Sequence, residues 1–106
     1  MWLRIDDNDK RPSKLINLDK IVSIETRIAT SGAMNGFCCA FARYDATAGY
    51  ECSAKHGDVF LAWFKDINES ECFIDELRNS IETGCKMESL FSLVYRAKRE
   101  YRKICG

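Results

Sequence analysis

Hydrophobic and polar residues alternate with a period of two through the first two thirds of the chain. In the segment 21–28, the apolar residues Val22, Ile24 and Ile28 alternate with polar ones, as in a strand that has one face in water. The same reasoning predicts strands at 2–5, in two segments within 14–25, and at 37–44, 50–54 and 59–67. The Asn35-Gly36 dipeptide predicts a turn before the strand at 37–44. Together these elements predict an antiparallel sheet or half-barrel of five to six strands.

The period changes to 3.6 in the last third, where two amphipathic helices are predicted. Asn68 or Ser70 is placed to cap the first helix, and Gly84 is a residue type that ends helices. The apolar stripes of the two helices are Phe73, Ile74, Leu77 and Ile81, and then Met87, Leu90, Val94, Ala97, Tyr101 and Ile104. A strand-rich part (1–67) and a helical part (68–106) predict one α+β domain, with the helices over one face or one open end of the sheet.

Three aromatic residues, Phe60, Trp63 and Phe64, lie in the most apolar strand, which predicts that they belong to the core. A platform for single-stranded nucleic acid would need cations interleaved with the rings, and Lys65 alone follows them in the sequence. The sequence therefore predicts packing for these rings rather than base stacking.

Composition and charge narrow the function classes. With 46% hydrophobic and 30% charged residues, the 106-residue chain is typical of an ordered globular protein. Its 16 Lys and Arg balance 16 Asp and Glu, which argues against direct nucleic-acid binding through phosphates. The acids close behind Met1 argue against an export signal, and the apolar stretch 59–64 is far shorter than the roughly 20 residues of a membrane span. We expect a cytoplasmic protein that does not enter membranes.

The total charge is balanced, but acidic and basic residues are concentrated in different segments of the sequence. Residues 66–82 hold six acids and one base, and residues 95–106 hold five bases and one acid. Two interpretations stay open: each run is a solvated helix face, with the two runs complementing each other across the helical hairpin, or each run forms a face for a partner. The residues predicted to contact a partner are Glu69, Glu71, Asp75, Glu76, Glu82, Arg96, Arg99, Arg102 and Lys103.

Six cysteines and one histidine suggest a metal site. Cys38, Cys39, Cys52 and His56 fall within 19 residues, and a hairpin between them would bring the last two beside the first two. Thiolate and imidazole ligands favour zinc, so a structural zinc site is one prediction. Candidates for a fourth ligand are Cys72, Cys85, Asp45 and Asp58. The alternative is that the thiols are reduced packing residues, because the spacing differs from C-x-x-C and adjacent strand residues point to opposite faces.

No feature of the sequence predicts catalysis. There is a single histidine, no glycine-rich loop of the kind that cradles phosphates and no local signature of a cysteine hydrolase. We therefore expect a protein that is not an enzyme.

The opening Trp2-Leu3-Arg4 and the later run LINLDKIVSI (15–24) form a pattern, W-[IL]-R followed by L-[IV]-N-L-D-x-[IV]-V-x-I. This pattern resembles a group of small, mostly uncharacterised proteins of low-GC Gram-positive bacteria and their phages. The acidic segment 70–77 looks like the helix that closes those proteins. The resemblance covers about half of the chain and implies a small barrel or half-barrel with a capping helix, similar to pleckstrin-homology-like domains.

A small protein with this resemblance looks like an accessory of a mobile element. Anti-CRISPR proteins, one populous class of such accessories, inhibit the nuclease Cas9 stoichiometrically by blocking DNA loading or a conformational change. The expected function is therefore a non-enzymatic protein-binding module of this kind, with the acidic helix as the contact. Two alternatives stay open. One is a structural module, a monomer or a homodimer through the C-terminal helix, and the other is a zinc-stabilised DNA-binding regulator that uses the C-terminal arginines and lysine.

Overall fold

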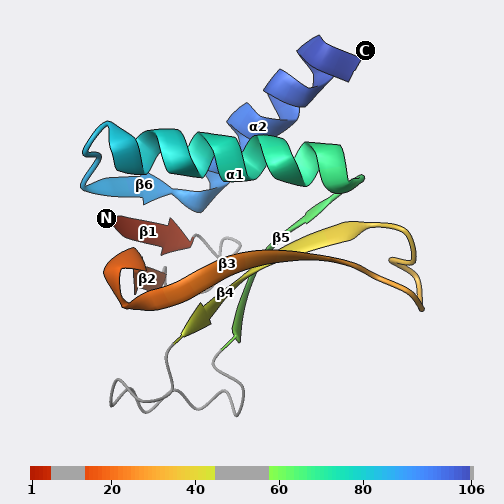
Figure 1. The fold of residues 1–106 in the computed structure, drawn as a ribbon, viewed down its shortest axis with the longest axis horizontal. Coiled ribbons are helices and arrows are strands. Elements are labelled where there is room, and N and C mark those ends of the chain that lie inside the picture. The colour runs from red at the N-terminus through yellow and green to blue at the C-terminus, as the bar shows by residue number, and fades with distance from the viewer. Residues whose placement is uncertain (6–13, 45–57, 106) are drawn as a thin grey trace.

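The computed structural model describes residues 1–5, 14–44 and 58–105 (Figure 1). In chain order the elements are β1 (Trp2–Ile5), β2 (Lys14–Asn17), the short 3-10 helix η1 (Leu18–Lys20), β3 (Ile21–Ile28), β4 (Cys38–Tyr44), β5 (Asp58–Phe64), α1 (Ile67–Glu82), β6 (Met87–Ser89) and α2 (Leu90–Cys105). The predicted α+β class is confirmed. The strand predicted at 50–54 lies outside the described residues.

The strands form two three-stranded sheets, not the single sheet or half-barrel that the sequence predicts. β1 is the centre of one sheet, with β2 antiparallel on one side and β6 parallel on the other. β4 is the centre of the second sheet, with β3 and β5 antiparallel beside it. The chain passes between the sheets at η1, where the Asn17 side chain accepts a hydrogen bond from the Asp19 amide at 3.0 Å. The prediction of one sheet is wrong because periodicity shows which residues share a face of a strand and leaves open which strands pair.

A turn and a bulge shape the β3-β4-β5 sheet. Gly36 has a φ of +89°, which favours glycine, so the predicted Asn35-Gly36 turn is confirmed in the β3–β4 connection. Between β4 and β5, Ala40 pairs with Ala62 and Phe41 pairs with Phe60, which leaves Leu61 as the extra residue of a β-bulge.

The bulge decides where two aromatic side chains point. In a regular strand, residues three positions apart point to opposite faces. Phe60 and Trp63 instead share the outer face, because the extra residue between them shifts the alternation by one. Phe64 is buried as predicted, but Phe60 is 53% exposed, so the prediction that all three rings belong to the core is wrong.

Helix α1 lies across the inner face of the β3-β4-β5 sheet (Figure 1). Its N-cap is Asp66, whose carboxylate accepts the Glu69 amide at 3.0 Å, rather than the predicted Asn68 or Ser70. After the helix, Gly84 has a φ of +76°, the left-handed conformation that ends many helices.

Residues 87–89 form β6 and not the first turn of the second helix, so the predicted division into a strand-rich and a helical part is wrong at this point. Trp2 pairs with Met87 and Arg4 pairs with Ser89 in the parallel ladder with β1. The sequence misses this strand because Met87 also fits the helical spacing of the residues after it, whereas its partner strand lies at the other end of the chain.

One core joins both sheets to both helices. Leu3 of β1, Phe64 of β5, Phe73 of α1 and Leu93 of α2 are all buried in it. The core therefore occupies one face of each sheet, and the two outer faces carry the surfaces described next.

Candidate interaction surfaces

The adjacent cysteines of β4 lie on opposite faces of their sheet. Cys38 is buried, and its thiol donates to the Ser70 hydroxyl of α1 over 3.5 Å. Cys39 is half-buried on the outer face, in register with Arg27 of β3 and Trp63 of β5. One metal ion therefore cannot bind both thiolates while β4 keeps its strand geometry.

The other predicted zinc ligands do not join them in the described part of the chain. Cys52 and His56 lie outside it, and the β5 residues paired with Cys38 and Cys39 are Phe64 and Trp63. Within 1–5, 14–44 and 58–105, no three His, Cys, Asp or Glu side chains converge to hold a metal ion. The zinc site stays a prediction, which elemental analysis of the purified protein tests.

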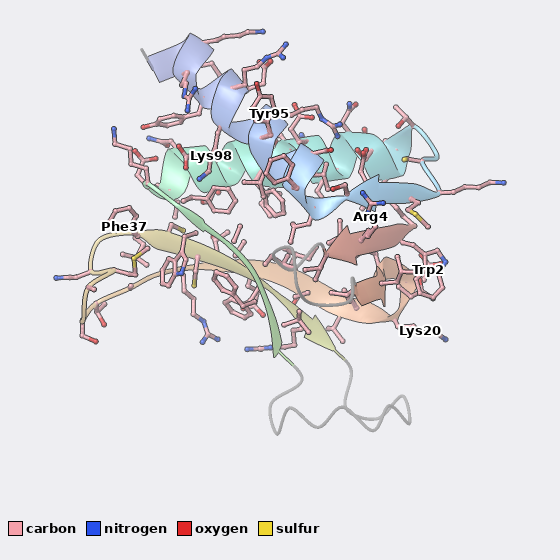
Figure 2. All side chains as sticks on the ribbon, turned by 180° about the vertical axis from the view of Figure 1, so that it is seen from behind. Trp2, Arg4, Lys20, Phe37, Tyr95 and Lys98 are labelled. Atoms are coloured by element: carbon pink, nitrogen blue, oxygen red, sulfur yellow. The ribbon has the colours of Figure 1, made fainter. Side chains whose placement is uncertain are left out.

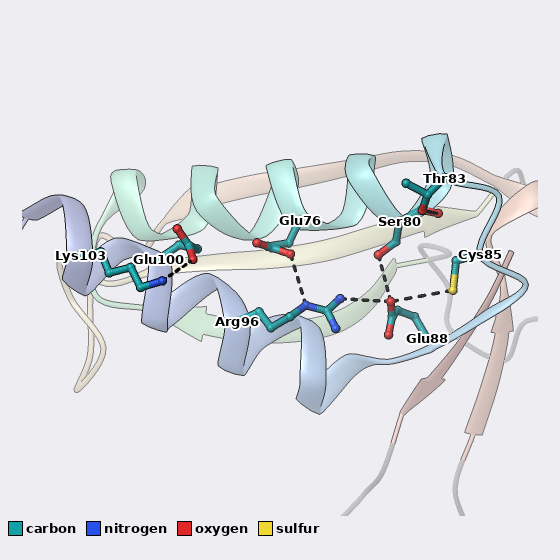
Figure 3. Close-up of polar contacts among 8 residues, drawn as sticks. All are labelled: Glu76, Ser80, Thr83, Cys85, Glu88, Arg96, Glu100 and Lys103. Atoms are coloured by element: carbon teal, nitrogen blue, oxygen red, sulfur yellow. Dashed lines mark hydrogen bonds and ion pairs between the residues drawn. The ribbon is translucent and has the colours of Figure 1, made fainter.

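Arg96 of α2 connects three elements (Figure 3). Its Nε donates to Glu76 of α1 at 3.3 Å, and one terminal nitrogen donates to Glu88 of β6 at 3.1 Å. Glu88 also accepts the Ser80 hydroxyl of α1 at 3.0 Å. The interpretation that the acidic and basic runs complement each other across the hairpin is confirmed here.

Further contacts join the start of α1 to the second half of α2. The Lys98 ammonium lies 4.0 Å from the carboxylate of Glu69, which is buried and also accepts the Lys65 amide at 3.0 Å. The Tyr101 hydroxyl donates to Asp66 at 2.6 Å. Glu69, like Glu76 and Arg96, is therefore engaged within the molecule, in contrast to its predicted role as a partner contact.

Two carboxyl groups are held charged by these contacts. Burial raises the pKa of Glu88, but the hydrogen bonds from Arg96 and Ser80 and the charge of Arg96 outweigh burial, so the pKa lies below its ordinary value. The hydrogen bonds from the Tyr101 hydroxyl and the Glu69 amide lower the pKa of Asp66.

The remaining acids predicted to contact a partner lie on the outer side of α1. Glu71, Asp75 and Glu82 are exposed, and Arg78 lies between the last two and pairs with Asp75 at 3.1 Å. The six-acid run of the sequence thus leaves three acids along this side of the helix.

The predicted basic contacts are divided as well. Arg99 and Arg102 are exposed on α2, whereas Lys103 pairs with Glu100 at 3.3 Å. The apolar stripe of α2 is buried inside the chain at Leu90 and Ala97. A dimer through this helix would therefore need its exposed apolar residues, which are Phe91, Tyr95 and Ile104.

The outer side of the β2-β1-β6 sheet exposes three large apolar side chains, Trp2, Leu15 and Met87, which we call the apolar face. Their exposed fractions are 44%, 53% and 52%. Trp2 and Arg4 are two positions apart in β1, so their side chains point to the same side of the sheet. Met87 pairs with Trp2 and Leu15 pairs with Arg4, which places Trp2, Leu15 and Met87 on that side. Trp2 and Arg4 project from β1 in Figure 2. An open groove of about 520 Å³ adjoins Trp2, and Ile81 at the end of α1 and Lys86 of the α1–β6 connection also line it.

A second surface lies at the end of β5, where the β3–β4 turn and α2 approach it. Aromatic rings and cations meet here, and we call it the aromatic–cationic surface: Phe37, Phe60, Trp63, Lys65, Lys98 and Arg102. The Phe60 and Trp63 ring centroids are 5.7 Å apart with a 52° tilt. Trp63 also lines an open groove of about 440 Å³, together with Phe37 and the three cations. Figure 2 labels Phe37 and Lys98 at this end of the molecule.

Neither helix in the described part of the chain is long and apolar enough to cross a membrane. No protein-family model, no curated protein and no solved structure matches this chain.

Proposed function

We propose that this protein is a non-enzymatic module that binds a protein partner through its apolar face. The observation that supports this proposal is that both sides of one small sheet carry large apolar side chains. Leu3 and Ile16 point into the core, and Trp2 and Leu15 alternate with them and point outward. A sheet side that faces only water is usually polar, so exposed apolar side chains gathered on one side are typical of an interface.

The composition of the apolar face agrees with a protein partner. Tryptophan, methionine and arginine are enriched at the centres of protein interfaces, and Trp2, Met87 and Arg4 share this side of the sheet. The adjoining groove offers space beside the Trp2 indole for a side chain of the partner.

The proposed partner is a host defence nuclease, with Cas9 as the first candidate. This part of the proposal rests on the resemblance of Trp2-Leu3-Arg4 to the opening of small phage proteins, and the same strand supplies the apolar face. A stoichiometric inhibitor needs no catalytic group, because occupying the nuclease is enough to prevent DNA loading or the movement that precedes cleavage.

Purified Cas9 loaded with guide RNA tests the proposal. We expect the immobilised protein to retain Cas9 and a micromolar excess to inhibit DNA cleavage. If neither occurs, Cas9 is not the partner.

Paired variants test which surface makes the contact. Trp2→Glu combined with Met87→Glu should weaken Cas9 binding at least about tenfold, because burying a charge in an interface without a partner is costly. Phe91→Glu combined with Ile104→Glu places the same two charges at exposed apolar positions of α2 and should bind like the unmodified protein. If the apolar-face variant binds normally while Glu71→Lys combined with Glu82→Lys does not, the contact is the acidic side of α1 instead.

A further inference from the structure

The aromatic–cationic surface combines exposed rings with cations, whereas the sequence predicts buried rings with Lys65 as the one neighbouring cation. The bulge at Leu61 turns Phe60 and Trp63 to the same outer side, and Phe60 is exposed there. The β3–β4 turn adds Phe37, which is also exposed. Ring faces that are open to solvent on a sheet are suited to stack unpaired bases.

The cations that the sequence lacks beside these rings come from other elements of the fold. Lys98 and Arg102 of α2 line the same groove as Trp63 and Phe37, and Lys65 follows β5 directly. Beside the rings on the outer face, Phe41 pairs with Phe60, and Arg27 of β3 lies 4.5 Å from the centroid of the Phe41 ring. Aromatic rings combined with neighbouring cations are the two components of surfaces that bind single strands.

The neutral net charge of the chain does not oppose this arrangement, because the charges of the described residues are unevenly distributed. Glu76 and Glu88 pair with Arg96 between the helices. Among the described residues that line the groove, Glu69 is the one carboxylate, against the three cations Lys65, Lys98 and Arg102. The local charge is therefore positive although the sum over the chain is zero.

We infer that the aromatic–cationic surface binds single-stranded nucleic acid, with bases stacked on Phe60 and Trp63 and phosphates held by Lys65, Lys98 and Arg102. An acidic peptide would meet the same cations, but the exposed Phe60 ring beside Trp63, at the edge of an open groove, favours planar bases over aliphatic side chains. This inference does not depend on the protein partner proposed above, because it uses a different surface.

Fluorescence anisotropy with a labelled single-stranded oligonucleotide of about 12 nucleotides tests the inference. We expect a dissociation constant on the order of micromolar at low salt. Contacts between three cations and phosphates predict a slope of about −2 in a plot of log affinity against log salt concentration. A duplex of the same sequence should bind at least about tenfold more weakly, because its bases are not available for stacking.

Matched variants test whether stacking and charge at this surface, rather than the loss of any exposed ring or cation, determine oligonucleotide binding. Phe60→Ala and Arg102→Glu should each weaken binding about tenfold or more. Phe91→Ala and Lys86→Glu make the same changes at exposed positions away from this surface and should leave binding unchanged. Circular dichroism and thermal melting confirm that each variant is folded. Phe60 is largely exposed, so its removal leaves the core intact.

Three results would overturn the inference. The first is the absence of oligonucleotide binding at low salt. The second is binding that Phe60→Ala leaves unchanged, since stacking would then contribute nothing. The third is equal competition by a poly-glutamate peptide of the same charge, which would assign the surface to acidic peptides.

Discussion

The two tryptophans of this protein lie on the outer sides of different sheets, and their neighbours differ. Trp2 is beside Met87 and above a groove next to Ile81. Trp63 contacts Phe60 and lines a groove with Lys98 and Arg102. Each ring sits on a short strand, but the residues that decide what it can bind come from elements distant in sequence. The comparison teaches that the chemistry of a sheet surface is set as much by the neighbouring elements as by the strand itself.

The largest expected effect is a difference in the free energy of unfolding between substitutions on the two sides of the β2-β1-β6 sheet. Leu3→Ala removes a fully buried side chain and should lower the free energy of unfolding by about 3 kcal/mol. Leu15→Ala changes an exposed side chain of the apolar face and should cost less than about 0.5 kcal/mol. Urea denaturation measures both. Similar losses for the two variants would show that the apolar face belongs to the core.

The next largest expected effect is on the ion pairs of Arg96, which join α2 to α1 and β6. Arg96→Met leaves Glu76 and Glu88 without their cation and should lower the free energy of unfolding by about 1–2 kcal/mol, since all three groups are partly exposed. Lys103→Met removes an exposed pair with Glu100 and should cost less than about 0.5 kcal/mol. An equal cost for both would mean that the Arg96 network contributes no more than a surface ion pair.

Much of the fold is predictable from the sequence, because its signals are local. The two helices follow from a 3.6 period, and Gly36 and Gly84 occupy the left-handed positions that their sequence context favours. The division into two sheets is not predictable in this way, since the pairing of β1 with β6 joins the two ends of the chain.

The surfaces are less predictable than the fold. Strand alternation places Phe60 and Trp63 on opposite sides, and only the extra residue Leu61 brings them together. The sequence shows Lys65 alone beside the rings, because Lys98 and Arg102 follow it by more than thirty positions and lie on helix α2. Of the two interpretations of the charge runs, mutual complementation is confirmed for Arg96, whereas Glu71 and Glu82 stay exposed.

A smaller effect is expected at the connection beside the apolar face. Gly84 has a positive φ, and a Cβ added there would contact nothing within 4 Å, so Gly84→Ala tests backbone conformation alone. It should lower the free energy of unfolding by about 1 kcal/mol. A change in oligonucleotide binding by this variant would contradict the separation of the two surfaces, since Gly84 lines the groove next to Trp2.

The smallest effect is a change in pH dependence. The pKa of Glu88 is lowered in the folded protein, so its contribution to stability is present above its unfolded pKa of about 4.5 and is lost as the pH falls through the lower folded value. Glu88→Gln should therefore lose less stability than the unmodified protein when the pH is reduced below about 4.5. Denaturant titrations at a series of acidic pH values measure the difference. Parallel pH profiles would show that Glu88 is not held charged by Arg96.

The two tryptophans also provide the most direct test of two separate surfaces. Each indole N–H gives its own signal in a ¹H–¹⁵N correlation spectrum, and the chain has two tryptophans. On titration with a single-stranded oligonucleotide, the Trp63 signal should shift or broaden while the Trp2 signal stays in place. Equal movement of both signals, or movement of the Trp2 signal alone, would contradict the assignment of nucleic acid to the end of β5 and the separation of the two surfaces.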